Sequence, residues 1–276
     1  MIRLFSIVIF ILSLSGNSYR SLNIKDIYDA NQFCDVENTA FVSGEELTYT
    51  IYYNWGIVWL PAGEVVFNVK ENQENYLYSA IGKTFPAYNW IFEVEDYFYS
   101  FVDKETLLPV RAKRNITEGG YRIINDITFD RDKKEVSSIV KINDKPAKTY
   151  KKKYDSCMFD ILSVIYSLRN IDKSRLSKGD QIPFNMMLDD EIYPLKLEYI
   201  GNKSKVEVKN LGKYEAIEIS PSIIKGRVFA KNERMKVWIS TGKNNIPLVI
   251  ESPLAVGKIK VVLQKYKGIK YPLIEG

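Results

Sequence analysis

Five carboxylic acids in the first part of the chain are the side chains best suited to acid–base chemistry: Glu45, Glu64, Glu93, Glu95 and Asp96. Two carboxylates hydrolyse glycosidic bonds when they stand about 5–5.5 or 6.5–9.5 Å apart. Glu45 and Glu64 each adjoin a glycine at the start of a strand, however, and that placement suits turn geometry equally well. The chain has no histidine, which excludes Ser-His-Asp triads, Cys-His pairs and His-zinc sites. We therefore predict no catalytic residue, no metal site and no cofactor, and keep a carboxylate-dependent carbohydrate-active enzyme as the least favoured alternative.

Two charged clusters have simpler interpretations than ligand binding. Asp189-Asp190-Glu191 offers oxygen ligands for calcium, but it lacks EF-hand spacing, and a charged hairpin turn explains it better. The basic stretch from Lys145 to Lys153 resembles a contact for anionic lipid or nucleic acid. Lysines also protect the exposed edge of a sheet, and no arginine-aromatic pattern of a nucleic-acid site accompanies them. We predict a solvated strand or hairpin edge and no nucleic-acid partner.

Aromatic residues are densest between positions 49 and 92. They are Tyr49, Tyr52, Tyr53, Trp55, Trp59, Phe85, Tyr88, Trp90 and Phe92. Apolar and aromatic side chains line most small-molecule pockets, although ordinary core and loop tips account for such a cluster too. Trp59 and Trp90 are expected in turns, where a core role is harder to assign. The predicted ligand-binding residues are Tyr53, Trp55, Trp59, Trp90 and Phe92.

The N-terminus has the pattern of an export signal. Arg3 precedes an apolar run over residues 4–14, and small residues end at Ser18. The run is too short to span a bilayer comfortably. We predict a signal peptide over residues 1–18, a soluble mature protein without a transmembrane anchor, and an N-terminal arm over 19–39; an uncleaved anchor is the alternative. The net charge of +5 becomes +4 once Arg3 is removed.

The chain contains two cysteines, Cys34 and Cys157. An exported protein with two cysteines favours a disulfide, which would tie the N-terminal arm to the predicted helix. Two unpaired thiols are the alternative, because a single pair gives no diagnostic spacing.

Alternating apolar residues predict a long series of antiparallel strands and one helix. Met158, Ile161, Leu162, Ile165 and Leu168 form an apolar helical face, so we expect a helix over about 157–170 with Asp155 or Ser156 as its N-cap. Roughly a dozen strands exceed a comfortable flat sheet. We expect a mainly β fold: one domain over 40–268 with a single curved antiparallel sheet, a half-barrel or partly open barrel, and the helix packed on the concave face. The expected strands and turns include a turn at 61–63 and separate strands at 193–200 and 205–209.

Four motifs in order resemble those of the bacterial domain of unknown function 3108 family. They are Phe41-x-x-Gly44-Glu45-x-Leu47-x-Tyr49 with Ala62-Gly63; residues 97–103 with 106–109; Phe159-Asp160-x-Leu162-Ser163-x-x-Tyr166-x-Leu168-Arg169; and Met235-x-Val237-Trp238-Ile239-Ser240 with Ile246-Pro247 and Gly257-x-Ile259. The turn at 242–245 lacks the aspartate that the family often carries there, which weakens any role of that acid.

The resemblance implies a location but supplies no activity. The form of residues 52–64 is similar to members from Bacteroides-like bacteria, which implies a Gram-negative periplasm. The expected plan is similar to half-barrel periplasmic lipoprotein carriers, which hold acyl chains between a curved sheet and a helix; this likeness is architectural only. The function predicted is a non-enzymatic periplasmic protein that binds an apolar or amphipathic envelope molecule, such as a lipid, in the cavity of the curved sheet. The alternative is an adaptor or structural module that contacts another envelope protein.

Overall fold

The structure is a computed structural model that describes residue 34 and residues 36–55, 58–90, 93–222, 234–254 and 257–276. The predicted signal peptide and most of the predicted N-terminal arm lie outside these residues. In chain order the strands are β1 (Glu46–Trp55), β2 (Val58–Glu71), β3 (Asn75–Thr84), β4 (Val94–Asp103), β5 (Pro109–Glu118), β6 (Tyr121–Asp130), β7 (Glu135–Ile142), β8 (Lys148–Lys153), β9 (Met158–Phe159), β10 (Gln181–Leu188), β11 (Glu191–Val208), β12 (Gly212–Pro221), β13 (Lys236–Ser240), β14 (Pro247–Pro253) and β15 (Lys258–Lys267). The described helices are α2 (Ile161–Leu168) and two 3-10 turns, η2 (Pro86–Tyr88) and η3 (Lys173–Arg175).

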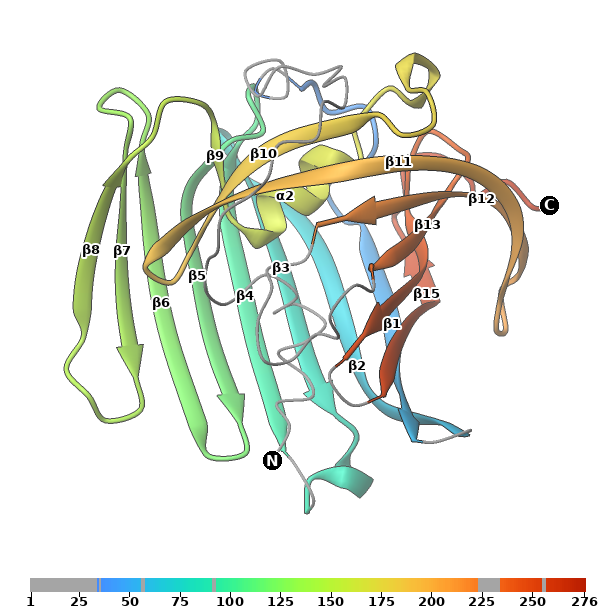
Figure 1. The fold of residues 1–276 in the computed structure, drawn as a ribbon, viewed down its shortest axis with the longest axis horizontal. Coiled ribbons are helices and arrows are strands. Elements are labelled where there is room, and N and C mark those ends of the chain that lie inside the picture. The colour runs from blue at the N-terminus through green and yellow to red at the C-terminus, as the bar shows by residue number, and fades with distance from the viewer. Residues whose placement is uncertain (1–33, 35, 56–57, 91–92, 223–233, 255–256) are drawn as a thin grey trace.

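The described strands form one 15-stranded sheet. Its order runs from β8 back to β1, then to β15, and back again to β9. All neighbours are antiparallel apart from the short parallel pair of β9 and β10. Figure 1 shows the sheet curled around α2, which contacts β3, β4 and β10. A mainly β fold with one curved sheet and a helix in its hollow is therefore confirmed.

Alternation along the strands builds the core, as the sequence indicated. In β1, Leu47, Tyr49 and Ile51 are at most 3% exposed, and every second residue of β4 is likewise buried. Successive side chains of a strand point to opposite faces, so each strand gives one row to the concave interior. The ring of Tyr166 on α2 stacks on Tyr78 of β3 with centroids 4.1 Å apart, which fixes the helix to the sheet.

The helix is shorter than the sequence suggested. Residues 158–159 pair with β10 as strand β9, so helical structure begins only at Ile161. The N-cap is Asp160, not Asp155 or Ser156. The side chain of Asp160 accepts hydrogen bonds from the backbone of Leu162 and Ser163, and the Ser163 hydroxyl accepts one from the Asp160 N–H. This capping box satisfies the free N–H groups of the first turn.

Two strand predictions were wrong at their boundaries. The turn expected at 61–63 is part of β2, with a register irregularity opposite it between Ile51 and Tyr52. Trp59 therefore lies in a strand and not in a turn. The strands expected at 193–200 and 205–209 are one strand, β11, with a register shift against β12 between Tyr199 and Lys203. An irregularity of this kind inserts residues without ending the strand. It interrupts the alternation of apolar and polar residues, so the sequence pattern suggests two strands where there is one.

Candidate ligand-binding site

A cavity of about 170 Å³ lies between α2 and the part of the sheet that contains β1 and β10–β15. Its lining is mainly aliphatic and aromatic, as in most sites for small organic ligands. The lining residues are Leu47, Tyr49, Phe67, Ile161, Val164, Ile165, Tyr166, Leu168, Arg169, Phe184, Leu197, Ile219, Pro221, Ser222, Met235, Val237, Ile239, Asn245, Pro247, Ile250 and Val261.

Secondary-structure periodicity places these apolar side chains. Ile161, Val164, Ile165 and Leu168 fall at i, i+3, i+4 and i+7 and form one face of α2. On the facing sheet, Val237 and Ile239 are two residues apart in β13 and so share a face. The capping box at Asp160 fixes where the helix begins and therefore which of its residues face the cavity.

One charged pair lies at the C-terminal end of α2. The Arg169 guanidinium donates two hydrogen bonds to the Glu45 carboxylate, at 2.6 and 2.8 Å, and its Nε donates to the Asn244 carbonyl at 3.1 Å. The side chains are 4% and 0% exposed. Burial alone would lower the pKa of Arg169, but the charge and hydrogen bonds of Glu45 outweigh it and raise the pKa. Arg169, the one charged side chain in the described lining, is thus neutralised locally.

Two buried polar atoms beside this pair have no hydrogen-bond partner among the described residues: the Tyr166 hydroxyl and the Asn245 side-chain oxygen. Tyr166 is 1% exposed and Asn245 is 6% exposed, and both line the cavity. The Arg169 guanidinium lies 5.2 Å from the Tyr166 ring centroid. The Asn245 amide nitrogen donates to the carbonyls of Arg169 and Ile171, which leaves its oxygen available as an acceptor.

The tyrosines of the lining stay uncharged at neutral pH. Burial raises the pKa of Tyr49 and that of Tyr166 well above the usual value, although the nearby Arg169 opposes the shift. The Tyr49 hydroxyl donates to the Pro247 carbonyl at 3.0 Å, whereas that of Tyr166 has no partner within the described part of the chain. The cavity therefore presents a long apolar wall, and the two unpartnered oxygens are buried in the protein beside it with almost no accessible surface.

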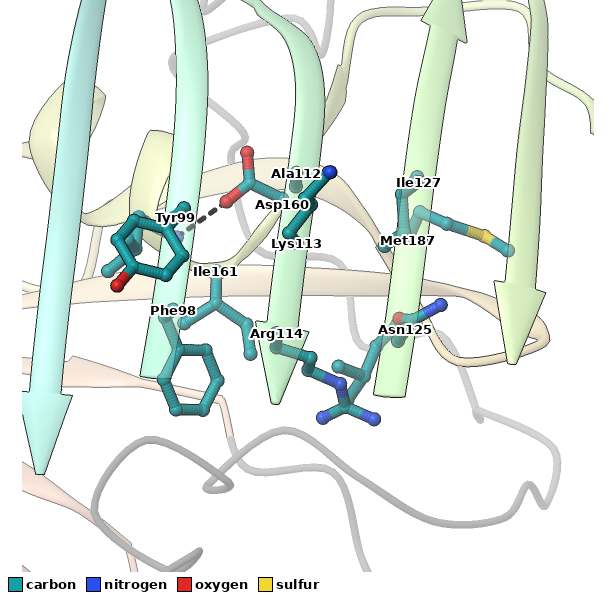
Figure 2. A pocket seen from close by; sticks show the side chains of 12 residues that line it. Phe98, Tyr99, Ala112, Lys113, Arg114, Asn125, Ile127, Asp160, Ile161 and Met187 are labelled. Carbon is teal, nitrogen blue, oxygen red and sulfur yellow. Dashed lines mark hydrogen bonds between the residues drawn. The ribbon is translucent and has the colours of Figure 1, made fainter. Parts of the chain in front are cut away.

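A second, much smaller pocket of about 20 Å³ lies near the N-terminus of α2, against β4–β6 and β10 (Figure 2). Asp160 lines it, and its carboxylate is held by the Ser100 hydroxyl at 2.6 Å as well as by the capping box. Nearby Arg114 forms an ion pair with Asp189. A space of this size holds little more than one water molecule and so excludes an organic ligand.

The aromatic residues predicted to bind a ligand lie elsewhere. Tyr53 is half-buried in β1, Trp59 lies in β2 at 36% exposure, and Trp90 follows η2 at 83% exposure. None of these three lines the 170 Å³ cavity. Trp55 ends β1, and its side chain, like the whole of Phe92, lies outside the described residues. A binding role for these five residues stays a prediction.

The residues that do line the polar end were not singled out from the sequence as binding residues. In the sequence, Tyr166 is part of a family motif and Asn245 is part of a turn. Arg169 belongs to the same motif and is also a favourable charge at the C-terminal end of the predicted helix. Arg169 meets Glu45 across 124 positions of sequence, a contact that no local pattern signals. One signal in the sequence could have indicated this contact. Arg169 ends a largely apolar helix, and an arginine buried there needs an acidic partner from elsewhere in the chain.

The remaining predicted clusters have structural partners. Two of the carboxylates considered for catalysis are Glu45 and Glu64. Glu45 is held by Arg169, and Glu64, half-buried in β2, lies opposite Thr50 of β1. Asp189 and Asp190 form the turn between β10 and β11, and Glu191 begins β11. The lysine-rich stretch forms β8, which is one edge of the sheet. Cys34 and Cys157 are joined by a disulfide with Cα atoms 5.5 Å apart.

Over the described part of the chain, no group of three or more metal-ligating His, Cys, Asp or Glu residues occurs. Among the helices that the structure describes, none has the length and apolar character needed to cross a membrane.

Comparisons with known proteins identify a family and a fold. The profile of a family of proteins of unknown function, DUF3108, matches residues 48–264. No curated protein matches the sequence. A β-barrel-like protein of DUF1849 from Brucella abortus is similar in structure, with a TM-score of 0.54 and 10% identity over 85% of this chain and 100% of that chain. A Bacteroides fragilis protein with a YMCC-like fold covers 84% of this chain and 99% of its own at 10% identity, with a TM-score of only 0.28. The first likeness supports the fold alone.

Proposed function

The chain belongs to the DUF3108 family of proteins of unknown function, and on that premise we propose that it is an exported binding protein of the Gram-negative periplasm. It holds an apolar or amphipathic envelope molecule in the cavity between α2 and the sheet. The observation that carries this proposal is the apolar lining of the cavity, to which α2 and the facing strands both contribute side chains. A packed interior would have left no such space.

The ligand is small or offers one slender chain to the protein. The cavity of about 170 Å³ lies below the range of about 300–1,000 Å³ that is usual for sites of drug-sized molecules. A single acyl chain fits these walls better than a lipid with several chains. Each buried methylene contributes about 0.8 kcal/mol, so a medium-length chain suffices for useful affinity.

Displacement of a fluorescent fatty-acid probe from the purified mature protein tests the proposal. We expect saturable binding that Val237→Phe, which fills the cavity from β13, weakens at least tenfold. Val110→Phe on β5, which is 38% exposed and away from the cavity, serves as the matched control. Absence of probe binding, or equal binding by both variants, would remove the cavity as the site.

Trp59→Ala and Trp90→Ala separate the cavity from the aromatic residues predicted from the sequence. If the cavity is the site, neither substitution changes probe affinity, because neither side chain lines it. Loss of binding in these variants alone would favour the aromatic site over the cavity.

An envelope adaptor is a second candidate, and one observation favours it. Val58, Trp59 and Leu60 at the start of β2 are 36–52% exposed, with Val58 and Leu60 on one face of the strand and Trp59 on the other. Exposed apolar side chains in a group mark many interaction surfaces. Crosslinking in intact cells followed by affinity purification should then give one defined partner with the parent protein and none with Trp59→Ala.

A further inference from the structure

We propose that the cavity recognises the far, apolar end of a straight alkyl or acyl chain and leaves the head group in the water outside. This inference rests on the proposed function and adds the chemical class of the ligand. The class is an amphiphile with one chain, unsubstituted at its far end and joined to a neutral or a charged head. Chains that carry a polar group at both ends are excluded.

The polar side chains of the described lining offer a ligand little to bind. They are Tyr49, Tyr166, Arg169, Ser222 and Asn245. Arg169 donates from both Nη atoms to Glu45 and from its Nε to the Asn244 carbonyl. The Tyr49 hydroxyl donates to the Pro247 carbonyl at 3.0 Å. The Ser222 hydroxyl donates to the carbonyl of Lys196 at 2.9 Å and accepts from its N–H at 3.1 Å. These three side chains are therefore already bonded within the protein.

Tyr166 and Asn245 do not change this picture. The Tyr166 hydroxyl and the Asn245 side-chain oxygen lack a partner among the described residues, but they have almost no accessible surface, so a ligand does not reach them. The Asn245 amide nitrogen donates to the carbonyls of Arg169 and Ile171. The surface that these residues present to the cavity is thus mainly carbon.

The C-terminal end of α2 is also without a free acceptor for a head group. The last carbonyls of an α-helix have no partner within the helix and commonly bind side chains, water or ligands. Here the carbonyls of residues 166–169 all accept hydrogen bonds, from Asn170, Ile171 and Asn245. The helix end beside the cavity is therefore satisfied by the protein itself.

A polar group that entered this cavity would lose its hydrogen bonds to water and gain none in return, which is unfavourable. Water would not accompany it, because a buried water molecule needs about two to four polar partners. A hydrocarbon chain has no such cost and gains free energy by burial against Val164, Ile165 and Val237. The far end of the chain therefore enters, and the head remains in solvent.

Competition with the fluorescent probe at pH 8 tests whether the head is recognised. 1-Decanol, decanoate and decyltrimethylammonium carry neutral, negative and positive heads on the same chain. We expect their affinities for the parent protein to agree within about threefold, because each head keeps its hydration in the complex. A larger difference among the three would overturn the inference.

A second comparison tests recognition of the chain end. 1,10-Decanediol differs from 1-decanol by one hydroxyl at the far end, and that hydroxyl has to be buried without a partner. We expect the diol to bind at least about tenfold more weakly than the alcohol. A smaller difference would overturn the inference while leaving the proposed function intact. Failure of all four compounds to displace the probe would instead refute the proposed function.

Val237→Phe assigns this selection to the cavity. Because the added ring fills the space from β13, the variant should bind both the alcohol and the diol weakly, and the ratio of their affinities should fall toward one. The control Val110→Phe, exposed on β5, should keep the ratio of the parent protein. A ratio that is unchanged in Val237→Phe would show that the selection arises outside the cavity.

Discussion

At the scale of single residues, the buried pair of Arg169 and Glu45 joins the end of α2 to the start of β1. Both side chains are almost fully buried, and the guanidinium also donates to the Asn244 carbonyl. A pair of this kind contributes modestly as a whole, because its desolvation offsets its attraction, but removal of one partner is severe. The pair therefore fixes the position of the helix more than it adds stability.

Glu45→Gln should lower the free energy of unfolding by about 3–5 kcal/mol, because Arg169 keeps a buried charge without its anion. Urea unfolding followed by tryptophan fluorescence measures the loss. Adding Arg169→Met should recover part of it, since the charge is then removed. The control Glu46→Gln breaks the exposed pair with Lys267 and should change stability by less than about 1 kcal/mol. Equal losses in the two single variants would contradict this account.

Asp96 gives the fold a dependence on pH. Its side chain is buried in β4, and burial, with the nearby Glu118 charge, raises its pKa to about 8. Between about pH 4 and 8 the folded state holds a proton that the unfolded chain has released. Stability should therefore fall as pH rises through this window, by up to about 1.4 kcal/mol per pH unit, and level off above it.

Asp96→Asn tests this dependence, because the amide does not titrate. The variant should be more stable than the parent at pH 8 and should show a flatter profile of unfolding free energy from pH 5 to 8. Glu95→Gln is the control, since Glu95 lies on the opposite, more exposed face of β4 and pairs with Lys83. A parent profile that rises with pH over this range would refute the assignment.

At the scale of elements, α2 depends on its cap. Asp160 accepts hydrogen bonds from two backbone N–H groups and from the Ser100 hydroxyl of β4, so it both starts the helix and attaches it to the sheet. Burial raises the pKa of Asp160, although these hydrogen bonds oppose the shift. An eight-residue helix is too short to be stable alone, so its position rests on such contacts.

Asp160→Ala should lower the free energy of unfolding by about 2 kcal/mol, through loss of the cap and of the partner of Ser100. Because the start of α2 also orders the cavity wall, binding of the fluorescent probe should weaken in the same variant. Asp172→Ala removes the cap of the exposed turn η3 and should have a smaller effect in both assays. Equal effects would show that capping of α2 has no special role.

Local sequence patterns predicted most strands and the helix, but not the boundaries and contacts that depend on distant residues. Alternation in residues 47–53 and 95–103 found strands, and the apolar repeat from Ile161 to Leu168 found the helix. The sequence did not reveal that Met158 and Phe159 would add to the sheet, because that pairing depends on β10, reached only after the helix. The residues that line the cavity were missed for a similar reason. Its lining comes from residues 47 to 261, and its polar end depends on a contact between distant positions.

At the scale of the whole molecule, connectivity requires the sheet to curl. β8 and β9 are the two edges of the sheet, yet only residues 154–157 separate them in sequence. A connection of that length spans at most about 18 Å, so the edges must approach at this point. Met158 of β9 accordingly packs in one apolar cluster with Val136 of β7 and Ile127 of β6. The hollow around α2 is therefore a consequence of chain connectivity as well as of strand twist.

The disulfide between Cys34 and Cys157 reinforces this arrangement, because Cys157 lies within the connection between the two edges. The bond closes a loop across 123 positions, which by the chain-entropy argument stabilises the fold by about 4–5 kcal/mol. Dithiothreitol should therefore lower the urea midpoint of the parent protein to that of the Cys34→Ser/Cys157→Ser variant. The double variant itself should not respond to the reductant. A parent protein that unfolds at the same urea concentration with and without reductant would show that the bond does not hold the edges together.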